Sequence, residues 1–293
     1  MSGFDNILGL LKDPPPEFAF EIAADGVAMS RTRPPAALQY VPLAPGIVAP
    51  SPVRENLLDP AAFAEVVRKL VPPATGRGRR GATLILPDNS VRITVLDFDK
   101  LPQKEEELRS LIQFRLRKSV PFDVDEAALS WHIQPGNKVI AALAPAEIVA
   151  HYEAPFRAAG LQPGMVTVSS LAMLDLLPTQ GSVVVARRSA GVLTVLALES
   201  GVVTLARALE LPEDSADPLD EIAADVYPTL AYIEDQTGKR PERLTIAGFG
   251  AEGESAAVRL AVELDLPVDA MDEPYPGLAG YLASLHHLKK AAA

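Results

Sequence analysis

The stretch Leu101–Ile133, LPQKEEELRSLIQFRLRKSVPFDVDEAALSWHI, decides how the fold is interpreted, because it joins a charged helix, a proline stop and a strand. Residues 105–119 are predicted to form a helix, since leucine and isoleucine recur there at helical spacing and basic residues crowd the last turn. Pro121 ends this helix, because proline disfavours helical geometry at the preceding residue and cannot donate a backbone hydrogen bond. Taken alone, the stretch is also compatible with an ordinary amphipathic helix that stops at a proline.

Composition sets the broad class of the protein. With 293 residues, 48% hydrophobic and 22% charged, the chain can bury a large core and should form about two lobes. A net charge of −11 argues against a nucleic-acid binder. The absence of cysteine excludes disulfides and thiolate metal sites. No apolar run reaches the length of a spanning helix and no secretory signal is visible, so we expect a soluble protein that is not secreted.

The rest of the chain alternates predicted strands and helices. Two strands are expected within residues 17–33 around the turn signal Asp25–Gly26. Further strands are predicted at 82–87, 91–98, 126–134, 138–144 and 244–247, with three more between 182 and 210. Helices are predicted at 59–70, 146–159, 219–236, 256–264 and 277–288.

An acidic helix, a basic turn, a Val-Pro-Phe stop and an acidic-apolar strand together resemble the signature of the PilM family, the cytoplasmic actin-like proteins of type IV pilus assembly. Relatives in type II secretion, and FtsA in cell division, share the fold more loosely. The resemblance runs from Phe18 to about Leu285. It implies an α/β, actin-like (ribonuclease-H-like) fold of two lobes with an inserted FtsA-type strand-helix-strand-strand small domain. The implied organisation is a leader at 1–16, a first lobe at 17–88 and 161–178, a small domain at 89–160 and a second lobe at 179–293.

Actin-like ATPases hold phosphates with two glycine-rich hairpins, because glycine lets the backbone approach an anion, and they use carboxylates as magnesium ligands. The first hairpin of PilM relatives, D-I-G-S-S-S-x-K, aligns with residues 21–28, where only Glu21 and Gly26 echo it. The second, V-D-I-G-x-x-x-T, aligns with residues 185–192, where Ala186 replaces its aspartate and Arg188 its glycine. Arginine can attract phosphate but cannot ligate magnesium, so the resemblance implies that hydrolysis is lost.

A third glycine turn of the family, T-G-G-G-A, is echoed by Gly248 and Gly250 around Phe249. Such a turn is also what any tight strand-to-helix connection selects. The expected protein is a pseudo-ATPase with no catalytic residue and no metal site. It would bind no cofactor, or would bind ATP and magnesium weakly through Glu21, Gly26, Gly248 and Gly250. The alternatives are a PilM-type protein whose nucleotide state controls lobe closure, and a sugar-kinase-like enzyme, which is disfavoured because phosphoryl transfer needs magnesium carboxylates.

The resemblance also implies a partner. PilM relatives bind the cytoplasmic tail of PilN, an inner-membrane protein, in a groove on the first lobe beside the small domain, and this mode uses apolar anchors and a sheet edge. The resemblance therefore implies a cytoplasmic scaffold or adaptor of type IV pilus assembly, or of the related type II secretion machinery, that is peripheral on the inner membrane through its partner. Other pilus assembly proteins are further expected partners, and no nucleic acid is expected. The candidate contact residues are Phe114, Arg117, Phe122 and Trp131. Core packing is the competing interpretation for the last two, and a solvated helix face for the arginine.

Two segments carry open alternatives. Residues 2–12 form an amphipathic pattern that either packs on the body, stays flexible, or docks on a membrane or partner. The glycine-rich basic run at 76–81 lacks the lysine and hydroxyl order of a P-loop, so we predict a surface turn rather than a phosphate site.

Overall fold

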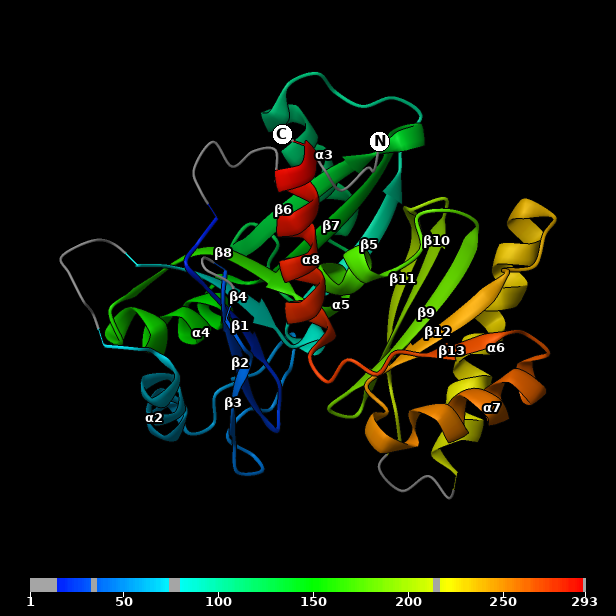
Figure 1. Ribbon diagram of the computed structural model, residues 1–293. Coiled ribbons are helices and arrows are strands. Elements are labelled where there is room, and N and C mark those ends of the chain that lie inside the picture. Colours follow the sequence, from blue (N-terminus) through cyan, green and yellow to red (C-terminus); the bar gives the residue numbers. More distant parts are fainter. Residues whose placement is uncertain (1–14, 33–35, 74–79, 213–216, 292–293) are drawn as a thin grey trace.

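The computed structural model describes residues 15–32, 36–73, 80–212 and 217–291. Two five-stranded sheets form two lobes, and a three-stranded sheet forms a smaller domain beside them (Figure 1). The leader expected at 2–12 and most of the basic run expected at 76–81 lie outside the described residues. Within the described ranges, no helix is both long and apolar enough to cross a bilayer.

The first sheet is mixed. The antiparallel hairpin of its first two strands turns at Asp25 and Gly26, as the sequence predicts. Parallel pairing then joins the first strand to the fourth and the fourth to the eighth, which lies at the edge of the sheet. Across the sheet the strands are β3 (Gln39–Pro42), β2 (Gly26–Arg31), β1 (Phe18–Ile22), β4 (Arg80–Leu86) and β8 (Leu161–Val168).

Helices cover both faces of this sheet. On one face, α2 (Pro60–Leu70) and α4 (Ala146–Ala158) bury their apolar sides against the strands. The start of α2 is fixed by Asp59, whose side chain accepts a hydrogen bond from the N–H of Ala62. On the other face lie the short α5 (Ser169–Ala172) and the long α8 (Pro276–Ala291), the red helix at the centre of Figure 1.

The second lobe repeats the arrangement. A meander of three antiparallel strands is followed in parallel by two more strands, and two helices, α6 (Pro218–Thr237) and α7 (Gly253–Leu264), cover one face. The other face packs on residues of α5, of the 3-10 turn η3 (Met173–Leu176) and of the small domain. The strands are, in order, β11 (Val202–Glu210), β10 (Val192–Glu199), β9 (Ser182–Ser189), β12 (Arg243–Ala247) and β13 (Val268–Ala270).

The small domain has the strand-helix-strand-strand order expected from the resemblance. Its helix α3 (Glu105–Leu116) packs on one face of the sheet and ends three residues before the predicted end at 119. Its other side is joined to the second lobe by Gln134, which donates to the carbonyl of Val203 and accepts from the N–H of the same residue, both at 2.9 Å. The sheet order is β5 (Arg92–Asp97), β7 (Lys138–Pro145) and β6 (Ala127–Gln134).

Two helices pack away from the lobe to which the sequence assigned them. The range 89–160, expected for the small domain, includes α4, which packs on the first sheet. The range 179–293, expected for the second lobe, includes α8, which also packs on the first sheet. Strands β8 and β13 were not predicted; in β8 the alternation of apolar and polar residues is interrupted by Pro163 and Gly164.

Candidate functional site

Glu21 lies where the two lobes and α8 meet. The residue is at the carboxyl end of β1 and only 1% exposed. One carboxylate oxygen accepts a hydrogen bond from the hydroxyl of Ser169, and the other accepts from the N–H of Leu278 at 2.7 Å. A buried carboxylate with these donors is satisfied by the protein itself.

Arg187 reaches across from the second lobe to this carboxylate. It belongs to β9, and its side chain is almost fully buried. Its guanidinium donates to Asp88 at 2.8 Å and lies 3.5 Å from Glu21. Asp88 follows β4 and also accepts from the N–H of Ser170 at 2.8 Å. We call Glu21, Asp88 and Arg187 the interlobe ion cluster; it places a positive charge from one lobe between two carboxylates of the other.

Burial is the largest influence on the pKa of the Glu21 carboxyl. It raises the pKa of the Glu21 carboxyl above its usual value of 4.5, and Arg187 offsets part of this rise. The hydrogen bonds from Ser169 and Leu278 lower the same pKa further, whereas Asp88 raises it. Two polar atoms beside the cluster, Arg187 Nε and Ser170 Oγ, are buried without a hydrogen-bond partner among the described protein atoms.

The sequence pattern singled out Glu21 but not Asp88, and Arg187 was covered only by the range 185–192 of the second hairpin. The signal was present: Asp88 comes directly after the buried strand β4, whose carboxyl end lies beside that of β1 in parallel pairing. Side chains that follow neighbouring parallel strands gather at one edge of a sheet, which is where such sites form.

Close packing explains the glycine at position 26, which was predicted to contact a cofactor. A side chain at this position would overlap the ring of Tyr40 on the neighbouring strand β3. The Tyr40 hydroxyl donates to the carbonyl of Asp25 at 2.8 Å, and its ring lies 5.3 Å from that of Tyr275. The first hairpin is therefore covered by an aromatic side chain of the protein.

The glycine turn after β12 is also occupied by protein groups. Gly248 has a φ of +81°, and a Cβ there would collide with the carbonyl oxygen of Arg188. The Arg188 guanidinium lies 4.7 Å from the ring centre of Phe249 and 3.8 Å from Glu252. Gly250 also has a positive φ, of +53°, but open space beside it. Gly248 is thus required by the close approach of β9, and Phe249 serves as a platform for Arg188.

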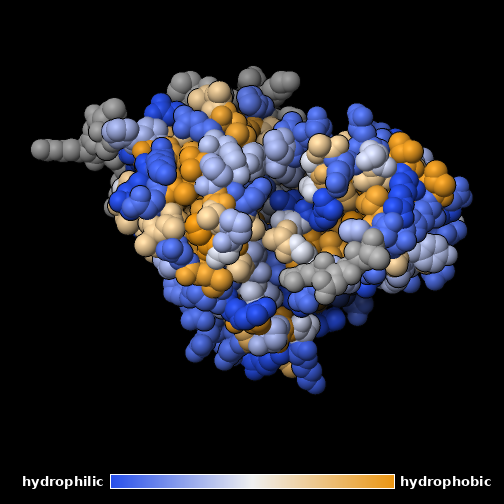
Figure 2. Space-filling view, turned by 90° about the horizontal axis from the view of Figure 1, so that it is seen from below, coloured by the Kyte–Doolittle hydropathy of each residue, from blue (hydrophilic) through white to orange (hydrophobic). Residues whose placement is uncertain are grey.

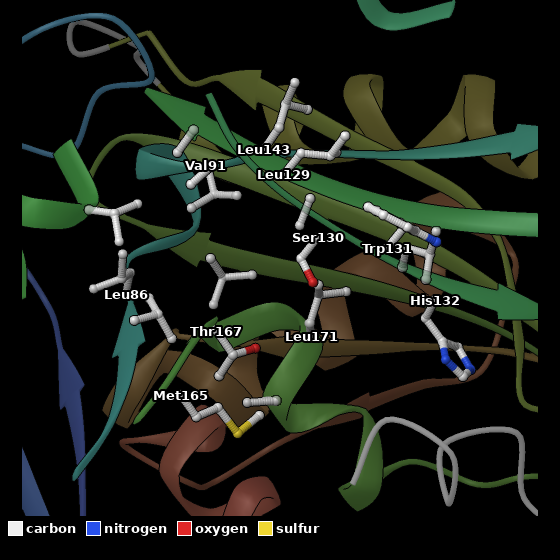
Figure 3. A pocket seen from close by; sticks show the side chains of 18 of the residues that line it. Leu86, Val91, Leu129, Ser130, Trp131, His132, Leu143, Met165, Thr167 and Leu171 are labelled. Carbon is white, nitrogen blue, oxygen red and sulfur yellow. The ribbon is translucent and has the colours of Figure 1, made fainter. Parts of the chain in front are cut away.

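A second candidate site is a groove of about 590 Å³ between the small domain and the first lobe. Met165, Thr167 and Leu171 lie along one side, and Leu129 and Ser130 along the other (Figure 3). The walls are mainly apolar, with a few polar groups. The lining also includes Arg109, Trp131, His132 and Asp175, and α8 contributes Tyr281 and Ser284.

Two sheet edges border this groove. β8 is the last strand of the first sheet, and β6 is the last strand of the small-domain sheet. Gly164 is the extra residue of a bulge in β8, since Ala82 pairs with Pro163 and Thr83 with Met165. An apolar groove between edge strands can hold an extended segment by backbone hydrogen bonds and side-chain anchors.

The structure brings one of the four predicted partner contacts into the groove. Trp131 lines it, under the guanidinium of Arg109 at 5.6 Å from the ring centre. Phe122 packs beside the small-domain core instead. Arg117 makes a two-oxygen ion pair with Asp125 on the surface, at 3.0 and 2.8 Å. Phe114 stands on the outside of α3 with 74% of its surface exposed.

Comparison with solved structures decides the fold class. The chain superposes on a chain of a PilM-PilN type IV pilus biogenesis complex with a TM-score of 0.71 and 19% identity, covering 95% of this chain and 99% of the other. A Bacteroides thetaiotaomicron protein with an actin-like ATPase fold and unknown function gives a TM-score of 0.58 at 12% identity, over 90% and 94% of the two chains. The fold is actin-like. No family model and no curated protein sequence matches the chain.

An actin-like fold raises the question of whether ATP and magnesium fit between the two lobes, at the interlobe ion cluster. The carboxylate oxygens of Glu21 and Asp88 all accept hydrogen bonds from protein donors, and a guanidinium stands between them. Magnesium needs open oxygen ligands in octahedral geometry, which this arrangement does not offer. Among the described residues, no cluster of three acidic or histidine side chains could hold a metal. The interlobe ion cluster does not fit the metal.

The raised pKa of Glu21 leads to a test of the cluster by pH. Between 4.5 and its higher folded-state pKa, the native carboxyl binds more protons than the unfolded one, so its contribution to stability falls as the pH rises. We expect the free energy of unfolding of the wild type, minus that of Glu21→Gln, to decrease with pH above 4.5 and then level off. Urea unfolding at a series of pH values up to about 8 measures this difference. A difference that increases with pH would show that Arg187 outweighs burial.

Proposed function

We propose that the protein is an adaptor of type IV pilus assembly that holds the cytoplasmic tail of a PilN-like inner-membrane protein in the groove between the small domain and the first lobe. The observation that carries this proposal is the groove itself, which combines apolar walls with two sheet edges. The likeness to a chain of the PilM-PilN complex over 95% of this chain supports the choice of partner.

The tail is expected to bind in an extended form. The backbone of β8 around its bulge offers hydrogen-bonding groups, and the space between Thr167 and Ser130 can accept apolar side chains. Trp131 and Arg109 close one end, where an aromatic or acidic residue of the tail would gain a stacking or charge contact. We place Trp131 among the partner contacts and leave Phe122 to the core.

The interlobe ion cluster supports a pseudo-ATPase. Arg187 ties β9 to both first-lobe carboxylates, so the cleft is held closed by side chains rather than by a nucleotide. A protein in this state would present the groove without an ATP cycle. The alternative, nucleotide-controlled lobe closure, would require Arg187 to leave two buried carboxylates, which is costly. The adaptor would sit at the cytoplasmic face of the inner membrane through its partner.

A peptide titration tests the proposal. A fluorescent synthetic peptide covering the cytoplasmic tail of the PilN-like protein from the same organism is titrated with the full chain and followed by anisotropy. We expect a Kd of about 1–10 µM, typical of a short segment in a preformed groove. A scrambled peptide of the same composition should not bind.

The same titration repeated with ATP and magnesium separates the two functions. If the protein is an adaptor without an ATP cycle, the peptide Kd should be the same with and without nucleotide. A calorimetric titration with ATP should then show no binding. Micromolar ATP binding that changes the peptide affinity would support the nucleotide-controlled alternative instead. Absence of peptide binding at about 1 mM would contradict the proposed partner.

A further inference from the structure

The outer side of α6 exposes apolar side chains that the proposed groove does not use. The inner side of this helix packs on the second sheet through Ile222, Val226 and Leu230. Tyr227 and Tyr232 point outward and are 60% and 51% exposed. Three smaller residues at helical spacing complete the surface. We define the α6 face as Ala224, Tyr227, Pro228, Ala231 and Tyr232.

Acidic residues surround the α6 face. The helix has five acidic residues and no basic one: Asp220, Glu221, Asp225, Glu234 and Asp235. Burial and the neighbouring Glu221 raise the pKa of Asp225, although Arg207 opposes the rise. Arg259 of α7 pairs with Asp220 at the start of the helix. An apolar surface in a negative field repels an anionic membrane and attracts a cationic protein surface.

The adjacent helix α7 also exposes apolar side chains. Val258 and Val262 of α7 are 69% and 81% exposed and lie one turn apart on the same side as each other. Arg259, between them in sequence, ties α7 to the first turn of α6. Figure 2 shows hydrophobic residues among hydrophilic ones at the right of the view, where the second lobe lies.

The small domain exposes an aromatic side chain that has basic residues beside it. Phe114 is the most exposed of the described aromatic residues, at 74%. It stands among basic residues of α3 and the turn that follows, where Arg115 stacks on Phe98 at 5.2 Å and Arg117 pairs with Asp125. Neither the core nor the groove uses the Phe114 ring. We define the α3 tip as Phe114, Arg115, Arg117 and Lys118.

We propose that the α3 tip of one copy of this protein docks on the α6 face of a second copy. The Phe114 ring would pack between Tyr227 and Tyr232, and the basic residues beside it would face the carboxylates of α6. Both surfaces belong to the described chain, and each supplies the charge and the apolar contact that the other needs. The inference is independent of the groove and its tail.

The two surfaces lie in different parts of the molecule, with α3 in the small domain and α6 on the far side of the second lobe (Figure 1). The contact is therefore heterologous, and each copy keeps one free end that can receive another copy. A contact between two helices buries less than the roughly 1,200 Å² of a standard interface, so the association is weak and needs high local concentration. Copies gathered on a membrane partner would meet that condition.

Sedimentation velocity on the full chain tests this inference, from about 5 to about 200 µM, the range in which so small an interface dissociates. We expect the wild type to sediment faster as its concentration rises in about 0.05 M salt, and less so in about 0.5 M salt, where the charges are screened. Phe114→Ser and Tyr227→Ser should each sediment as monomers. Leu58→Ser, which alters a residue of the first lobe with a similar exposed fraction, should behave as wild type.

Mixing the two variants provides the decisive measurement. The Tyr227→Ser copy keeps its α3 tip and the Phe114→Ser copy keeps its α6 face, so an equimolar mixture has one intact contact. The mixture should form a one-to-one dimer and nothing larger. A wild type that is monomeric over the whole range, variants that associate like the wild type, or a mixture that stays monomeric would each overturn the proposal.

Discussion

Replacing Arg187 with methionine is expected to lower the free energy of unfolding by about 3–5 kcal/mol, the cost of removing one partner from a buried ion pair. Glu21 and Asp88 would lose the charge between them while both carboxylates stay buried. Methionine fills much of the same volume, so the loss reports on charge rather than on a cavity. Urea unfolding at neutral pH, followed by circular dichroism, measures the change.

The neighbouring arginine provides the control for this substitution. Arg188 is one residue further along β9, but its side chain is 31% exposed and contacts Phe249 and Glu252. Arg188→Met should cost only about 0.5–1 kcal/mol, the value of an exposed cation–π contact. In Glu21→Gln, the further change Arg187→Met should cost less than it does in the wild type. Equal costs for Arg187→Met and Arg188→Met would show that the interlobe ion cluster does not hold the lobes.

Local patterns predicted the elements of the fold well. The Asp25–Gly26 signal gave the first hairpin, because a two-strand pattern on either side of a tight turn is a short-range property. The spacing of apolar residues gave α2, α3 and α6, whose buried residues follow that spacing. Local patterns also predicted the order of strand, helix, strand and strand in the small domain. Only the family resemblance, however, identified this segment as an inserted domain.

The centre of the cleft could not be predicted in the same way. Arg187 meets Asp88 and Glu21 over sequence separations of 99 and 166 residues, and no local pattern encodes such pairs. The position of α8 is a second example, because its apolar residues show that it packs but not on which lobe. β8 was missed since a bulge with Pro163 and Gly164 breaks the alternation that identifies a strand.

One helix connects the closed cleft to the groove. The N–H of Leu278, in the first turn of α8, binds Glu21, and Tyr281, one turn later, lines the groove. The Tyr281 hydroxyl accepts a hydrogen bond at 2.9 Å from Thr83 of β4. Gly280 lies between Leu278 and Tyr281 in α8. A Cβ at this position would collide with the backbone of Ala172. These contacts of α8 with the first lobe hold one wall of the groove, and one of them binds Glu21 of the interlobe ion cluster, so the groove is formed before a partner arrives.

A preformed groove can be blocked without disturbing the fold, and Gly164 is the position at which to do it. We expect Gly164→Trp to weaken binding of the PilN-like tail peptide by about 100-fold or more, because an indole placed there competes with the peptide for the groove. Gly164 lines the groove, and a Cβ added to it meets no atom within 4 Å. Its backbone does not adopt the left-handed conformation, so the free energy of unfolding should change by about 0.5 kcal/mol or less.

The matched control is Leu38→Trp, which adds the same indole beside β3, at the opposite edge of the first sheet from β8. Leu38 is 46% exposed, so a larger side chain can be accommodated in solvent. This variant should bind the peptide as the wild type does, which separates blocking of the groove from a general effect of tryptophan. If Gly164→Trp bound the peptide with wild-type affinity while remaining equally stable, the tail would have to bind elsewhere, and the edge of β8 would not be its site.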